Sequence, residues 1–173
     1  MPDGGYGVSD ESFVPGPATA RVFRDALGRF ATGITVVTAG GDAGPVGLTA
    51  NSFASVSLDP ALVLWSPAKS SSRFERFMSA RQYAIHVLAA DQHALCRHFV
   101  RPGASFELPG IAFSDAGTPL LAGCLARFEC EQVAAHDAGD HAIIVGRVLR
   151  ASLRQGEPLV FSAGRYGRFL PEG

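Results

Sequence analysis

The spacing of the apolar segments most strongly limits the folds open to this chain. Short runs of apolar residues recur between Gly, Asp and Pro turns, and the gaps are too short for regular parallel crossovers, which need a dozen or more residues. The predicted strands are ITVVTA from Ile34, LTANSFASVSLDP from Leu48 to Pro60, ALVLWS from Ala61, YAIHVL from Tyr83, Cys124 to Ala134, Ala142 to Leu153, and Leu159 to Phe161. We therefore expect a mainly β, mainly antiparallel barrel with a few peripheral helices.

Three helices are expected around this barrel. The first runs from about Thr19 to Phe30, since Thr19 can cap it and apolar residues such as Phe23 fall on one face. A second helix is predicted through Ser71 to Met78. Asp91 is expected to cap the third, within DQHALCRHFV.

The composition limits the number of domains. A chain of 173 residues that is 47% hydrophobic and 18% charged can build one substantial core and little of a second. The first residues, MPDGGYGVSDESFVPGP, are rich in glycine, proline and acidic side chains and have no basic region followed by an apolar segment. We expect a mobile tail over residues 1–17 and a single domain over 18–173.

Charge and hydropathy exclude several classes of partner. The formal net charge is −1, which gives no electrostatic basis for binding nucleic acid. The longest apolar runs, Ala61 to Trp65 and Ala142 to Val145, are far too short to cross a bilayer, so no membrane span is expected. The three cysteines are odd in number and lack CxxC spacing, which argues against a disulfide framework and a zinc site. A cytoplasmic protein with reduced thiols is the simplest interpretation.

The stretch from Leu48 to Pro60 is unusual for a strand because it is rich in small polar residues. Read at period two, one face is mainly apolar and is expected to join the core; it carries Ala50, Ser52, Ala54, Val56 and Leu58. The other face is mainly polar and carries Thr49, Asn51, Phe53, Ser55 and Ser57. Taken alone, such a pattern is typical of an edge strand with a solvated face.

No common catalytic or metal-binding motif is present. The sequence has no GxSxG, HExxH or P-loop. His93 and His98 are expected on the surface of a helix, and His86 as a partly buried side chain with its hydrogen bonds satisfied. His136 and His141 flank HDAGDH, whose spacing matches no common metal motif, so no metal is expected. An organic cofactor would then carry the chemistry, and the protein would bind and orient it.

Two polar segments are candidates for holding such a cofactor. Residues Thr49 to Ser52 offer hydroxyls, an amide and backbone groups, and SPAKSSSR, from Ser66 to Arg73, offers more hydroxyls and two cations. If the fold brings the segments together, they would suit a phosphate and a ring edged with carbonyls and nitrogens. Taken alone, three serines before a helix more often serve as caps and linkers.

The order of the motifs resembles the short-chain flavin reductase family, the reductase components of two-component flavin monooxygenases. The resemblance covers nearly everything from Phe23 to Phe169. The segments that carry it are FRDALGRFATGITVVTA, GLTANSFASVSLDPALVLWS, KSSSRF, YAIHVL, LCRHF, GTPLLAGCLARFEC, AGDHAIIVGRV and GRYGRF.

This resemblance implies a Greek-key split β-barrel of the FMN-binding type, normally a homodimer. It implies an NAD(P)H:flavin oxidoreductase that reduces free FMN or FAD by hydride transfer and supplies reduced flavin to a partner monooxygenase. The flavin-binding positions that it implies are Thr49, Ala50, Asn51, Ser52, Ser55, Ser66, Lys69, Ser70, Ser71 and Ser72. It places His141, and Tyr166 at the same mouth, beside the nicotinamide. No side chain is implied to become covalently attached to a substrate.

The sequence departs from the family pattern at two places, and two alternative functions remain open. Residues Ala104 to Glu107 depart from the family pattern, and Arg73 stands where a small or hydroxyl residue is expected; it would contact a phosphate or lie in solvent. The alternatives are a pyridoxamine-phosphate-oxidase-like flavoprotein and a flavin carrier without nicotinamide-dependent turnover. The choices between FMN and FAD, and between NADH and NADPH, stay open, since Arg165, Arg168 or Arg73 would have to meet a 2′-phosphate.

Overall fold

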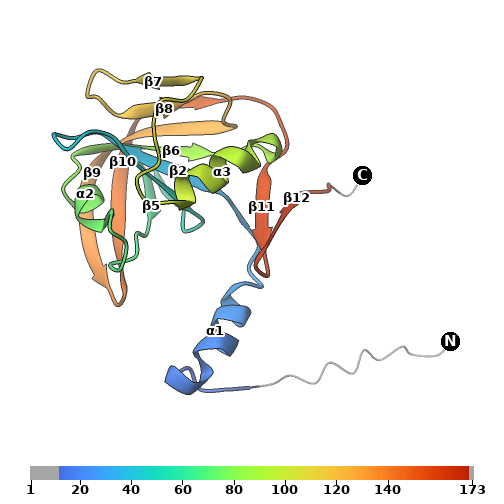
Figure 1. Ribbon diagram of the computed structural model, residues 1–173. Helices are drawn as coiled ribbons and strands as arrows, with labels where there is room; N and C mark the ends of the chain where they lie inside the picture. The colour runs from blue at the N-terminus through green and yellow to red at the C-terminus, as the bar shows by residue number, and fades with distance from the viewer. Residues whose placement is uncertain (1–11, 172–173) are drawn as a thin grey trace.

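A computed structural model describes residues 12–171 and consists mainly of antiparallel strands (Figure 1). The strands are β1 (Thr32–Gly33), β2 (Thr35–Ala39), β3 (Val46–Ala50), β4 (Ala54–Leu58), β5 (Ala61–Trp65), β6 (Gln82–Val87), β7 (Ile111–Phe113), β8 (Pro119–Leu121), β9 (Ala126–Ala138), β10 (His141–Leu153), β11 (Leu159–Ser162) and β12 (Arg165–Arg168). The helices are the 3-10 turns η1 (Pro17–Thr19) and η2 (Ala90–Gln92), and α1 (Ala20–Leu27), α2 (Phe74–Met78) and α3 (His93–Val100). None of the described helices is long and apolar enough to span a membrane.

The main sheet curls into a barrel that is split along one side. Its seven strands follow the order β3-β2-β6-β9-β10-β5-β4, so β3 and β4 lie at opposite edges. Only residues 51–53 connect these edges, and such a segment spans at most about 14 Å. The edges of a flat seven-stranded sheet would be about 29 Å apart, so the sheet must close on itself. The expected mainly β split barrel with peripheral helices is confirmed.

The core has two parts, which lie on opposite faces of β2. Inside the barrel, Trp65 packs edge-on against Phe77, with ring centroids 4.9 Å apart, beside Val37 of β2. On the outer face, Val36 of β2 packs with Phe99 of α3. Because successive strand residues point to opposite faces, a strand covered on both sides is buried throughout. This explains why every residue of β2 is buried.

The predicted strand from Leu48 to Pro60 is wrong in two respects. The strand is interrupted at residues 51–53, and its two halves are β3 and β4 at the two edges of the main sheet. The face expected to join the core is also wrong in its second half, because the side chains of Val56 and Leu58 are 48% and 97% exposed. The alternation of β4 therefore does not reflect burial within this chain.

The helices are shorter than predicted, and their caps differ. Thr19 does not cap α1; its hydroxyl accepts a hydrogen bond from the Gly16 N–H (2.9 Å) and donates one to the Val14 carbonyl (2.8 Å). Asp91 lies inside η2 and is not the cap, since the Gln92 side chain accepts the Ala89 N–H. Residues 74–78 alone form α2. In the absence of a strong cap, the preceding residues form 3-10 turns or coil.

Two small sheets contain strands that were not predicted from the sequence; of their members only β11, expected over Leu159 to Phe161, was predicted. Strands β7 and β8 form a separate pair, and β1, β11 and β12 form a three-stranded sheet near the C-terminus. Helix α1 stands away from the sheets beyond this small sheet (Figure 1), and none of its residues is buried. Of the predicted tail over residues 1–17, residues 1–11 lie outside the described part of the chain.

His86 is a buried histidine that joins three strands. Its Nδ1 donates to the Val36 carbonyl of β2 (3.0 Å), and its Nε2 accepts the Leu121 N–H of β8 (3.1 Å). Both bonds require the neutral ring, and burial lowers the pKa of His86 to about 4. The prediction of a satisfied side chain is confirmed, but His86 is fully rather than partly buried.

His86 is therefore expected to make folding stability depend on pH. The unfolded chain takes up a proton near pH 6.5 and the folded chain only near pH 4, so stability falls as the pH falls through this window. The shifted pKa of His86 contributes at most about 3 kcal/mol to the pH dependence of the free energy of unfolding. Denaturant unfolding at several pH values measures it, and His86→Gln should flatten the curve. The exposed His136→Gln should leave the slope as in the wild type, and equal slopes for all three proteins would contradict the assignment.

Candidate functional site

A cavity of about 320 Å³ lies where the barrel is split. It is lined by the end of β3, the loop after β5 and the start of β10. The lining residues are Leu48, Thr49, Ala50, Asn51, Ser52, Ser66, Ala68, Ser70, Ser71, Arg73 and His141. The two polar segments singled out in the sequence, together with His141, thus form one site.

The loop of residues 66–73 is held against the hairpin of β9 and β10. The Lys69 N–H donates to the Asp140 carbonyl (2.9 Å), and the Ala142 N–H donates to the Pro67 carbonyl (3.1 Å). Gly139 makes the hairpin turn in the left-handed region, with a φ of 68°, which glycine adopts without strain. The Gly-Asp-His motif is therefore placed beside the serine-rich loop by the tight turn that it forms.

Ser52 fastens the split of the barrel. Its hydroxyl accepts the Ser66 N–H (2.9 Å) and donates to the Ser66 carbonyl (3.2 Å). This exchange mimics a pair of strand hydrogen bonds between the segment that follows β3 and the loop that follows β5. The hydroxyl of Ser52 thus has both of its roles filled within the protein, although it lines the cavity.

Thr49 presents an acceptor to the cavity rather than a donor. Its hydroxyl hydrogen is donated to the Cys96 carbonyl of α3 (2.7 Å), which leaves only lone pairs for a ligand. The neighbouring carbonyl of Ala50 accepts the Thr35 hydroxyl (2.8 Å). Side-chain donors that the lining offers a ligand include the amide of Asn51 and the hydroxyls of Ser70 and Ser71.

Arg73 has a structural role that the sequence did not indicate. Its guanidinium donates to the carbonyls of Gly47 (3.1 Å), Phe99 (2.9 Å), Val100 (3.2 Å) and Arg101 (3.2 Å). It thereby compensates the carbonyls at the C-terminal end of α3 and ties them to β3. Burial also lowers the pKa of Arg73. Its terminal nitrogens are therefore engaged by backbone carbonyls of the protein.

Lys69 is turned out of the cavity, although both of its neighbours in the chain line it. Its ammonium forms an ion pair with the Asp137 carboxylate of β9. The hydrogen bond and the charge of Lys69 hold the pKa of Asp137 below its ordinary value. The lysine that the sequence placed near a phosphate is thus paired within the protein.

His141 carries a partner on one ring nitrogen only. Its Nδ1 lies 2.7 Å from the Asp140 carboxylate, which can only accept, so Nδ1 is the donor. This bond lowers the pKa of Asp140. The remaining nitrogen, Nε2, is left to meet a ligand, so the aspartate sets the orientation of the ring.

Besides Lys69, three more of the implied site residues do not line this cavity. Ser55 lies on β4 opposite Val63, and Ser72 is exposed in the loop. Tyr166 lies on β12, where its hydroxyl accepts the Cys96 thiol (3.5 Å) and its ring meets that of His93 at 4.6 Å. That contact makes His93 partly buried, not the surface residue expected.

Cys96 joins both parts of the site and was missed in the sequence. Its carbonyl accepts the Thr49 hydroxyl and its thiol contacts Tyr166, although it is fully buried in α3. No spacing pattern marks such a residue, because both bonds depend on tertiary packing.

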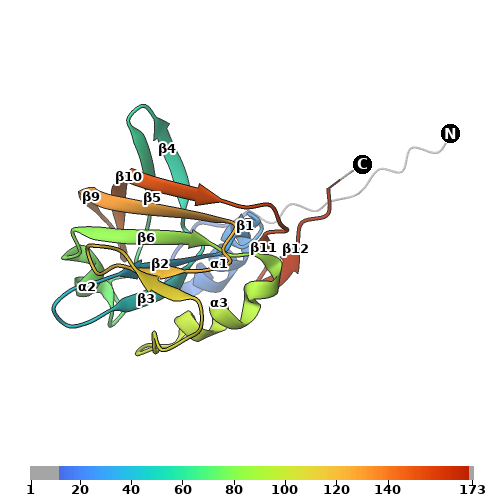
Figure 2. The ribbon, with the colours of Figure 1, turned by 90° about the horizontal axis from the view of Figure 1, so that it is seen from above.

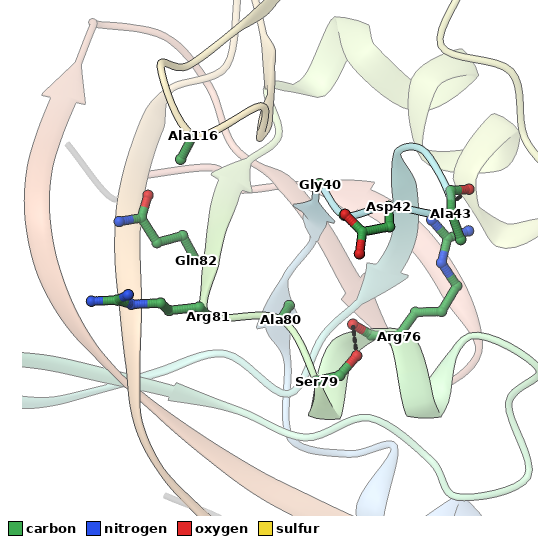
Figure 3. Close-up of a pocket in the computed structure, with 10 residues that line it drawn as sticks. Gly40, Asp42, Ala43, Arg76, Ser79, Ala80, Arg81, Gln82 and Ala116 are labelled. Atoms are coloured by element: carbon green, nitrogen blue, oxygen red, sulfur yellow. Dashed lines mark hydrogen bonds between the residues drawn. The ribbon is translucent and has the colours of Figure 1, made fainter.

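A larger cleft, of about 770 Å³, lies elsewhere in the described chain (Figure 3). It lies between the β2–β3 turn and the start of β6; Arg81 and Gln82 lie on one side of it, and Asp42 and Arg76 on the other. Arg76 is engaged there by the carbonyls of Ala43 and Gly44. This cleft shares no lining residue with the cavity at the split. Within residues 12–171, no group of three acidic, histidine or cysteine side chains is placed to hold a metal ion.

Comparison with known proteins places this architecture in a family. Residues 27–170 match the family described as "Flavin reductase like domain". The chain is 59% identical over 161 residues to "FMN reductase (NADH) SmoA" of Agrobacterium fabrum, which covers 93% of this chain and 92% of that protein. It is 39% identical over 158 residues to the "NADH-dependent FAD reductase" of Streptomyces globisporus, covering 86% and 85% of the two chains.

Solved structures agree with the sequence match. The NADH:FAD oxidoreductase SgcE6 of Streptomyces globisporus superposes with a TM-score of 0.86 at 38% identity, over 94% of this chain and 100% of that one. BorF, the flavin reductase component of a bacterial two-component tryptophan halogenase, gives a TM-score of 0.81 at 38% identity, over 88% and 99% of the chains. This chain therefore belongs to the flavin reductase-like domain family.

Proposed function

We propose that this protein uses NADH to reduce a free flavin nucleotide, FMN or FAD, by hydride transfer. The observation that carries the proposal is the cavity at the split, which brings Thr49 to Ser52, the serine-rich loop and His141 together. A relative that is 59% identical and is named for NADH-dependent FMN reduction supports it. Residues 18–173 would form the single flavin reductase domain.

The lining fits a flavin in its chemistry. A flavin ring is edged with carbonyls and one N–H, and the acceptor of Thr49 and the amide of Asn51 suit those groups. The hydroxyls of Ser70 and Ser71 would hold the phosphate. The flavin, when bound, accepts the hydride, so the chain needs no nucleophile of its own.

The residues of the hairpin would position the nicotinamide. Asp140 fixes the His141 ring and leaves Nε2 for the carboxamide of the nicotinamide. Tyr166 would lie at the same opening of the site, and Cys96 would connect it to Thr49 on the proposed flavin side. Donors on the flavin side would stabilise the negative charge that develops on the ring as it accepts the hydride.

The product would serve a partner monooxygenase. Related proteins are named as reductase components of flavin-dependent monooxygenases, among them the trigonelline monooxygenase reductase of Acinetobacter baylyi, 49% identical over 130 residues that form 42% of that protein. HsaB of Rhodococcus jostii, 37% identical, is named as a monooxygenase reductase subunit. We place the protein in the cytoplasm, where its three unpaired cysteines would stay reduced.

A homodimer would cover apolar surface that a single chain leaves exposed. On α1, the side chains of Phe23 and Leu27 are 41% and 60% exposed, although both are large and apolar. On β4, Val56 and Leu58 are exposed as well. Exposed apolar surface on two elements that project from the barrel (Figures 1 and 2) is typical of an interface between subunits.

Turnover that depends on added flavin tests the proposal directly. Purified protein mixed with NADH in air should oxidise NADH at a rate that rises with added FMN or FAD and saturates. NADPH should give the lower kcat/KM, as the names of the relatives suggest. Flavin binding without NADH oxidation would favour a carrier or an oxidase and would contradict a reductase.

The role of His141 can be separated from flavin binding. His141→Ala should raise the KM for NADH about tenfold, the loss expected for one charge-assisted or well-aligned hydrogen bond, and should change the flavin Kd less than twofold. His136→Ala is the matched control, because that histidine is exposed on the same hairpin and does not line the cavity. An unchanged KM for NADH would remove His141 from the nicotinamide site.

Substitutions on the exposed face of α1 test the proposed homodimer. Replacing both Phe23 and Leu27 with Glu should weaken association at least about tenfold, since each buried side chain of this size is worth about 1.5–3 kcal/mol. Sedimentation velocity over a concentration series measures the shift toward monomer. The substitution Arg21→Glu adds a negative charge to the same helix without removing an apolar side chain and serves as the control. A wild-type protein that stays monomeric at high concentration would contradict the dimer.

A further inference from the structure

The ion pair between Lys69 and Asp137 has a consequence for the proposed phosphate subsite. Ala68 and Ser70 line the cavity, but the lysine between them does not, because its ammonium lies at Asp137. The backbone of Lys69 is held in place by the Asp140 carbonyl, so the loop already sits beside the cavity. A rotation of the Lys69 side chain alone would therefore bring its charge toward the serine hydroxyls.

The other cation of the loop gives little help to an anion. Arg73 lines the cavity, but its terminal nitrogens donate to four backbone carbonyls. Its Nε is buried and has no protein partner in the described chain, so neither solvent nor a ligand reaches it. The described lining thus offers a phosphate hydroxyls and backbone groups, but no free positive charge.

We propose that Asp137 weakens the binding of the flavin phosphate by holding Lys69 away from it. This inference rests on the proposed function and specifies how tightly its flavin binds. A phosphate carries close to two negative charges at neutral pH and would take the ammonium as a charge-assisted partner. Asp137 competes for that ammonium, so Lys69 reaches the phosphate only when the ion pair breaks.

The competition suits a reductase that releases its product. Both partners of the pair are exposed, Lys69 at 40% and Asp137 at 79% of the side chain, so the pair is weak and exchanges readily. Flavin then binds through its ring and hydroxyl contacts and leaves without first breaking a strong phosphate contact. Asp137 therefore makes flavin an exchangeable substrate rather than a permanently bound group.

Binding measurements with and without the phosphate test this role. Quenching of flavin fluorescence in the absence of NADH gives the Kd for FMN and for riboflavin, which lacks the phosphate. Asp137→Asn should lower the Kd for FMN roughly three- to tenfold, the range for a freed charge-assisted contact in a partly exposed site, and should leave riboflavin within about twofold. Asp42→Asn removes the same charge from the separate cleft (Figure 3) and should leave both values unchanged.

The double substitution shows whether Lys69 carries the effect. With Lys69→Met in place, adding Asp137→Asn should change the Kd for FMN less than about twofold. A gain that persists without the lysine would overturn the assignment, as would an unchanged FMN Kd in Asp137→Asn or an equal gain for riboflavin. These results would leave the reductase function standing if wild-type protein oxidises NADH with FMN. Failure of that turnover contradicts the proposed function itself.

Discussion

The three-residue connection between the two edges of the barrel is the constraint on which the site depends. Residues 51–53 must join strands that lie at opposite ends of a seven-stranded sheet. The sheet can satisfy this only by closing, and the closure leaves a split, since β3 and β4 do not pair. Ser52 bridges the split through Ser66. Small polar residues are therefore found here because the chain passes between two unpaired edges, where backbone groups are open to a ligand.

The charges around the split are nearly all engaged within the protein. Lys69 is paired with Asp137, Arg73 with four carbonyls, and His141 with Asp140. Each of these contacts fixes a loop, a turn or a helix end, so these side chains shape the site before they meet any ligand. A site of this kind recognises a ring by well-placed neutral groups, which favours selectivity over tight binding of an anion.

The sequence predicted much of the fold because local signals and tertiary structure agree there. The strands that begin near Ile34, Ala61 and Tyr83 are confirmed, since apolar runs between turn residues fold the same way in most contexts. The strand from Leu48 to Pro60 was wrong because its alternation continues across a break that only the barrel closure requires. The apolar side chains of β4 resembled core because period-two alternation marks one face of a strand as apolar without showing that this face is covered.

Within the site, sequence reasoning found the residues whose neighbours in the chain also belong to it. Thr49 to Ser52, Ser70, Ser71 and His141 meet in one cavity, as expected from the two polar segments and the Gly-Asp-His turn. It did not find the direction of each bond. Thr49 donates to Cys96 and is left as an acceptor, and Arg73 points to α3. The directions of these hydrogen bonds depend on α3, which is distant from both residues in the sequence.

Helix α3 links the two halves of the proposed site. The Cys96 carbonyl accepts a hydrogen bond from the Thr49 hydroxyl, and the Cys96 thiol donates to the Tyr166 hydroxyl. The last carbonyls of α3 accept hydrogen bonds from the Arg73 guanidinium. The end of β3, the serine-rich loop and the C-terminal hairpin of β11 and β12 are thus fastened to one eight-residue helix. A shift of α3 would move all three together, which would keep Thr49 and Tyr166 at a constant distance from each other. The helix is also buried against the outer face of β2 through Phe99, so the close packing there resists that shift.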